Sequence, residues 1–160
     1  MRTAYLVSLL ALLALPASAL DIQKSSQIGD WQVIAAQTAN DGLSCQALLS
    51  ASNGSLLLWG SQDRNSITPL VGLGSGYPKG SRAVVNIAGQ SFEFHQPKPA
   101  GANRFSPVAK ADDAKIVRSL SNNRNAKVVG KGKGGQFTLR ITRMKQVLSF
   151  FNSNCEISLR

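Results

Sequence analysis

The chain has few of the side chains on which most metal and enzyme sites depend. Its 160 residues include one histidine, two cysteines and eight acidic residues, against 18 lysines and arginines. A structural zinc site takes about four ligands from Cys, His, Asp or Glu. If the two cysteines pair, one histidine and scattered carboxylates do not supply them. The composition therefore predicts no metal site and no cofactor.

Catalytic groups are equally scarce. The only histidine, His95 in "SFEFHQ", shares a strand face with Glu93 and is expected to be an exposed residue at a strand end. A catalytic triad needs a histidine bonded to a nucleophile and to an orienting carboxylate, and neither partner can be placed. Paired catalytic carboxylates need no fixed spacing, yet residues 20–103 contain only five acids and nothing marks two of them as partners. We expect no enzymatic activity, and a hydrolase has no positive feature in its favour.

A long apolar run occurs only at the start, in "MRTAYLVSLLALLALPASAL". One arginine, an apolar run from Tyr5 to Leu15 and the small residues 17–19 have the layout of a secretory signal. The run is shorter than the roughly 20 residues that span a bilayer, although a retained membrane anchor is the alternative. We expect residues 1–19 to be a signal peptide and 20–160 to form a single domain in the periplasm or outside the cell, without a membrane span.

Only Cys45 and Cys155 are available for a disulfide. In an exported chain an even pair of cysteines predicts one bond between them. The chain-entropy model gives a loop of about 110 residues a stabilisation of roughly 4–5 kcal/mol. Two independent buried thiols are the alternative.

The positive charge is concentrated in one part of the sequence. Residues 20–103 carry five basic and five acidic side chains, whereas residues 104–145 carry eleven basic side chains against Asp112 and Asp113, a net of +9. Such asymmetry bears on partners rather than on fold. It favours an anionic partner, such as a polymer of the cell envelope or of a host surface, or an exported protein.

A phosphate-binding loop and a nucleic-acid surface both fit this basic segment poorly. The stretch "GKGKGGQ" lacks the Ser or Thr that follows the lysine of a phosphate-binding loop. Base recognition uses aromatic side chains among the basic ones, but residues 104–145 contain only Phe105 and Phe137. We therefore expect neither a nucleotide site nor nucleic-acid binding, and a well-solvated hairpin remains the plain alternative.

Alternating apolar residues between turn residues predict short strands. The first is residues 29–37; a hairpin over 43–61 is expected to turn at Asn53-Gly54, and a second over 81–95 at residues 88–90. Helical spacing predicts a helix after Asp112 or Asp113, one of which would cap it, and a second from about residue 143 to Phe151.

The basic segment itself predicts a third hairpin. Pairing Val129 with Gln136 places Val128 opposite Phe137 on an apolar face and leaves residues 130–135 as the loop. The other face is polar and basic. The candidate binding residues are Lys127, Lys131, Lys133 and Arg140, together with Arg143 and Lys145 just beyond the hairpin.

The order of these segments resembles the invasion-associated locus B family of exported bacterial proteins. The similar pieces are "IGDWQV", "SCQALL", "PLVGLGSGYPKGSRAVVNIAGQSFEF" and the stretch from "AKIVRSL" to "FFNSNC". The family usually has a second cysteine pair after the central hairpin, where this chain reads "HQPKPAGANR". The resemblance implies an immunoglobulin-like β-sandwich and a non-enzymatic role in the envelope or in host-cell interaction, with no catalytic residues to transfer.

Together these features predict a mainly β protein, an immunoglobulin-like β-sandwich with two or three short helices and one disulfide. The expected function is binding of an anionic partner through the basic C-terminal hairpin. The alternative is a periplasmic inhibitor or immunity protein for an exported enzyme, in which a loop such as residues 95–105 would block an active site.

Overall fold

The fold is mainly β, as the sequence predicts. The computed structural model describes residues 21–38, 42–74, 80–96, 104–132 and 135–158. In these ranges the chain forms ten antiparallel strands and two helices. The expected signal peptide, residues 1–19, lies outside the described residues.

The ten strands and two helices have the following bounds in chain order. The strands are β1 (Asp21–Ile28), β2 (Trp31–Thr38), β3 (Gly42–Ala51), β4 (Gly54–Ser61), β5 (Ser66–Gly72), β6 (Arg82–Ile87), β7 (Gln90–His95), β8 (Arg104–Pro107), β9 (Lys127–Gly132) and β10 (Gly135–Arg140). Helix α2 (Asp112–Asn122) separates β8 from β9, and α3 (Met144–Cys155) follows β10.

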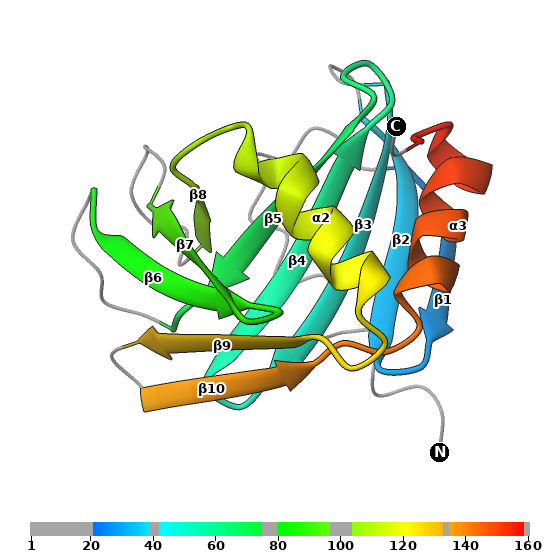
Figure 1. The fold of residues 1–160 in the computed structure, drawn as a ribbon. Helices are drawn as coiled ribbons and strands as arrows, with labels where there is room; N and C mark the ends of the chain where they lie inside the picture. Colours follow the sequence, from blue (N-terminus) through cyan, green and yellow to red (C-terminus); the bar gives the residue numbers. More distant parts are fainter. Residues whose placement is uncertain (1–20, 39–41, 75–79, 97–103, 133–134, 159–160) are drawn as a thin grey trace.

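Hydrogen bonds join all ten strands in the order β1-β2-β3-β4-β5-β8-β7-β6-β9-β10. The four-residue strand β8 is the corner, because Phe105 pairs with Val71 of β5 while Pro107 pairs with Phe94 of β7. Beyond this corner the sheet turns back, so that β9 and β10 contact β3 and β4. Figure 1 shows both helices lying across one face of β2–β5. The core is enclosed between the two halves of the sheet and these helices.

Helix α3 is held against the sheet by apolar packing and by the disulfide. Its buried side chains include Val147 and Phe151. Gly60 of β4 lets it approach closely, since a Cβ added there would lie 2.6 Å from Ile157 Cδ1 and 2.9 Å from Phe151 Cδ1. Burial of each large apolar side chain contributes about 1.5–3 kcal/mol.

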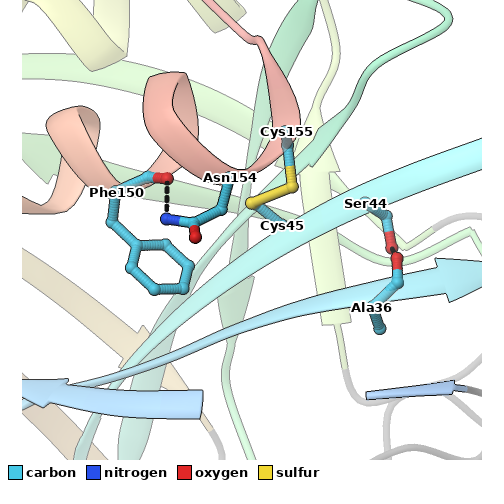
Figure 2. Close-up of a disulfide and its surroundings, with 6 residues drawn as sticks. All are labelled: Ala36, Ser44, Cys45, Phe150, Asn154 and Cys155. Carbon is cyan, nitrogen blue, oxygen red and sulfur yellow. Dashed lines mark hydrogen bonds between the residues drawn. A yellow bond between two sulfur atoms is a disulfide. The ribbon is translucent and has the colours of Figure 1, made fainter. Parts of the chain in front are cut away.

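The predicted bond between Cys45 and Cys155 is confirmed. It joins β3 to the last turn of α3, 110 residues apart in sequence, with the two Cα atoms 6.1 Å apart. Figure 2 shows this turn, in which the Asn154 side chain donates a 2.8 Å hydrogen bond to the Phe150 carbonyl. Both cysteines are fully buried. A disulfide is typical of proteins in oxidising, non-cytoplasmic compartments.

The first predicted hairpin forms, but its turn lies one residue earlier than expected. Ala51 pairs with Gly54, so Ser52 and Asn53 make the turn and Gly54 begins β4 without a positive φ. The second hairpin turns at Ala88 and Gly89, with φ values of 51° and 85°, within the predicted interval. Positive φ at both central residues is the geometry of a type I′ turn.

The two helices also form close to where the sequence predicts them. The prediction that Asp112 or Asp113 caps α2 is wrong, because Ala111 occupies the N-cap and no side chain caps the helix. Asp113 instead accepts a 2.9 Å hydrogen bond from the Thr68 hydroxyl of β5. This bond ties the first turn of α2 to the sheet.

The sequence predicts no membrane span after the leader. Within the ranges that the structure describes, neither helix is both long enough and apolar enough to cross a bilayer.

Candidate functional site

The hairpin β9–β10, which carries the basic stretch, has a different register from the one that the sequence suggests. Phe137 pairs with Gly130, and Val128 pairs with Leu139. The strands therefore extend to Gly132 and Gly135, and the expected six-residue loop shrinks to residues 133–134. Because the change in register is an even number of residues, every side chain keeps its predicted face.

The glycines of this stretch are explained partly by packing rather than by loop conformation. The ring of Phe137, which is 4% exposed, covers both Gly130 directly opposite and Gly54 at the start of β4. A Cβ at either glycine would overlap the ring. Gly130 has no positive φ, so its role is to make room for the aromatic side chain, whereas Gly135 has a φ of 107°. An aromatic side chain over a strand glycine also supplies packing that the glycine lacks.

The outer face of the hairpin carries three cations. Lys127 and Arg140 are directly opposite each other, and both are exposed. Side chains in such a pair have their Cβ atoms about 4.5–5.5 Å apart, and like charges there are destabilising. Lys131 is exposed on the same face, four residues from Lys127, which corresponds to about 13 Å along the strand.

No carboxylate in the described part of the chain neutralises these three cations. The one ion pair found among the described residues joins Arg82 Nη1 to Glu93 Oε1, at 2.7 Å, on β6 and β7. The surface formed by Lys127, Lys131 and Arg140 is called the hairpin cation face below. Its net charge of +3 follows from these three side chains.

Two of the other three candidate residues, Arg143 and Lys145, lie beyond the hairpin at the start of α3. Lys133 lies outside the described residues. Arg143 is the N-cap of α3, in the left-handed region at φ 56°. Its side chain lies beside the β1–β2 turn, since a Cβ on Gly29 would be 3.0 Å from Arg143 Cδ. Lys145 is exposed on α3.

Other basic residues of the +9 segment are engaged elsewhere. The Lys115 ammonium lies 5.5 Å from the centre of the Phe92 ring, a cation–π contact. Arg104 is partly buried, and this burial lowers the pKa of its guanidinium from the ordinary value. The charge excess of the segment is therefore spread over several surfaces.

One feature beside the hairpin cation face is not predicted from the sequence. An open depression lies between the β6–β7 turn (Ala88 and Gly89) and residues 123–127, which run from the end of α2 to the first residue of β9. Arg124 and Lys127 both line it. The sequence shows Arg124 as one of the basic residues of this stretch. Its position near the β6–β7 turn depends on tertiary structure and could not be predicted.

The remaining chemical candidates are limited. His95 ends β7 and is half-buried rather than exposed, with its Nδ1 atom buried and without a hydrogen-bond partner. The described ranges contain no group of three or more His, Cys, Asp and Glu side chains arranged to hold a metal ion. The loop suggested as an active-site plug falls largely on residues 97–103, outside the described residues.

Comparisons with known proteins add no identification. No family model matches the chain, no curated protein matches its sequence, and no solved structure matches its fold.

Proposed function

We propose that this chain is an exported, non-enzymatic protein that binds an anionic partner through the hairpin cation face. The partner class is an acidic polymer of the cell envelope or of a host-cell surface. In this proposal residues 1–19 are removed on export and residues 20–160 act as one domain in the periplasm or outside the cell. Membership of the invasion-associated locus B family is part of the same proposal and is supported by the order of the sequence segments.

The pair Lys127 and Arg140 is the observation that carries the proposal. Two like charges directly opposite each other on a sheet cost stability, on the order of a few tenths of a kcal/mol to 1 kcal/mol. The described residues supply no ion-pair partner to either cation. An anionic ligand bound at this pair would attract both side chains and so offset the repulsion between them.

The arrangement of the hairpin supports a binding role for its outer face. Its inner face is fixed by the buried side chains of Val128, Phe137 and Leu139. The cations therefore stand on a strand pair that the core holds in place, and rigid placement lowers the entropic cost of binding.

The proposal includes an immunoglobulin-like β-sandwich as the specific type of this mainly β fold. The contact of β9 and β10 with β3 and β4 supports two layers. The continuous hydrogen bonding through β8 favours a single bent sheet instead.

A matched pair of charge-reversal variants tests the proposal. Lys127→Glu/Arg140→Glu changes the net charge by the same amount as the control Lys24→Glu/Lys110→Glu, whose two lysines are exposed on β1 and just before α2. Binding of the oxidised protein to dextran sulfate is measured at about 50 and 200 mM salt, since counterion release makes such binding salt-dependent.

We expect the hairpin variant to bind at least about tenfold more weakly, equivalent to about 1.4 kcal/mol, with a shallower salt dependence. The control should lose less than about threefold, because distant exposed charges are screened within roughly 10 Å at 0.1 M salt. Equal losses in both variants would mean that net charge alone acts. Unchanged binding in both variants would refute the proposed function.

A further inference from the structure

The depression beside the hairpin cation face has the dimensions of a small-ligand site. It has a volume of about 340 Å³ and lies between the β6–β7 turn and residues 123–127. Pockets for small molecules are typically about 300–1,000 Å³. The space therefore exceeds what a single phosphate or carboxylate group would need.

Backbone hydrogen bonds fix both walls of the depression. The Ala88 N–H donates to the Lys127 carbonyl at 2.9 Å, and the Ala126 N–H donates to the Asn123 carbonyl at 3.1 Å. The Gly89 N–H donates to Asn86 Oδ1 at 3.1 Å. The site thus exists before a ligand arrives, which reduces the ordering cost of binding.

The charges around the depression favour an anion. Arg124 and Lys127 line it, both exposed, and the described residues of its lining include no carboxylate. Arg140 adds a third positive charge opposite Lys127. Helix α2 ends next to this site at Asn122, and its C-terminus contributes about half a negative charge. The two lining cations exceed that contribution.

The remaining lining groups suit a ligand with hydroxyl groups. Asn123 and Asn125 line the depression, and an amide both donates and accepts hydrogen bonds. The Asn123 Nδ2 already donates to the Ser119 carbonyl at 2.7 Å, so its side-chain oxygen remains as an acceptor. A guanidinium such as that of Arg124 binds carboxylate or phosphate through two parallel hydrogen bonds. No aromatic ring occurs among the described lining residues, and stacking of a nucleic-acid base would require one.

We propose that this depression binds one sugar unit bearing a carboxylate or phosphate group. Arg124 holds the acidic group, and the amides of Asn123 and Asn125 bind the sugar hydroxyls. The inference rests on the proposed function, in which the hairpin cation face attracts an acidic polymer, and it assigns one unit of that polymer to a defined site.

The test uses the full oxidised protein and short ligands. Backbone amide shifts are followed by NMR during titration with a galacturonic acid trimer, glucose 6-phosphate, inorganic phosphate, and a neutral glucose trimer as control. We expect the shifts to be concentrated at residues 88, 89 and 123–127. The acidic sugars should bind at least about fivefold more tightly than inorganic phosphate or the neutral trimer, because only they satisfy both sets of groups.

Arg124→Gln and Asn125→Ala should each weaken binding of the acidic sugars at least about fivefold, whereas the control Lys110→Gln, at an exposed lysine outside the depression, should leave it unchanged. If inorganic phosphate binds as tightly as the acidic sugars, or if Arg124→Gln binds like the unaltered protein, the sugar site is refuted. The proposed function fails separately, when Lys127→Glu/Arg140→Glu retains its affinity for dextran sulfate. Loss of dextran sulfate binding in that variant, with no effect of Arg124→Gln on any ligand, would refute the sugar site alone.

Discussion

Removal of the disulfide should lower the thermal stability by an amount that the structure allows us to calculate. The bond joins residues 110 positions apart, and the chain-entropy model gives about 5 kcal/mol for a loop of that length. A domain of about 140 residues has an unfolding entropy of about 0.3 kcal/mol per kelvin. Loss of the bond should therefore lower the midpoint of thermal unfolding by about 17 °C.

The assay is thermal unfolding followed by circular dichroism, on the oxidised protein, the protein reduced with dithiothreitol, and Cys45→Ala/Cys155→Ala. Both cysteines are fully buried, so the alanine variant loses packing as well as the bond. The reduced protein loses only the bond, so the change in its unfolding midpoint measures the loop-entropy contribution alone. A reduced midpoint within about 4 °C of the oxidised one would refute the calculation, since it would correspond to only about 1 kcal/mol.

Two further predictions test other parts of the fold. Phe137→Ala should cost about 3–5 kcal/mol in the free energy of unfolding, measured with urea, because it uncovers two strand glycines and empties a buried ring site; a cost below about 1 kcal/mol would contradict this packing. Burial raises the pKa of the Asp113 carboxyl, although the hydrogen bond from Thr68 opposes the shift. The folded chain therefore binds more protons than the unfolded chain from the ordinary aspartate range up to the raised pKa, and stability falls as the pH rises through that window. Asp113→Asn should flatten this slope, whereas the control Asp30→Asn, at an exposed residue between β1 and β2, should retain it; the same slope in both variants and in the unaltered protein would exclude Asp113 as its source.

The sequence was sufficient to predict the faces of the strands and helices. Alternation within residues 81–95 predicts that Val85, Ile87, Phe92 and Phe94 face inward, and all four are buried. Period-two alternation depends only on whether a residue position is odd or even. For the same reason the outer face of β9–β10 was correctly predicted from a pairing that was two residues out of register.

The registers and turns could not be predicted, because they depend on contacts between distant segments. Asn53-Gly54 is a strong turn signal by local chemistry, but Gly54 lies under the ring of Phe137, 83 residues later in the chain (137 minus 54). The same ring requires Gly130 inside β9 rather than in a loop. Local propensity is a weak guide where a tertiary contact determines which residue must lack a side chain.

The predicted alternation also places only one face of each strand in the core, whereas β2 is buried on both faces. Alternation within residues 29–37 predicts that Trp31, Val33 and Ala35 share one face, and all three are buried. Ile34 and Ala36 are buried as well, on the opposite face. A nearly continuous apolar run is typical of a strand that is covered on both sides, so the signal was present in "VIAA".

The contrast between the segment charge and the surface charge limits what composition can predict about binding. The +9 of residues 104–145 counts Lys115, which lies over an aromatic ring, and Arg104, which is partly buried. Cations that share one face act most strongly on a ligand at that face, because the field of a more distant exposed charge is screened over roughly 10 Å at 0.1 M salt. In the described structure Lys127, Lys131 and Arg140 meet that condition. It follows that neutralising any one of these three should weaken polyanion binding more than neutralising Lys115, although both changes lower the net charge equally.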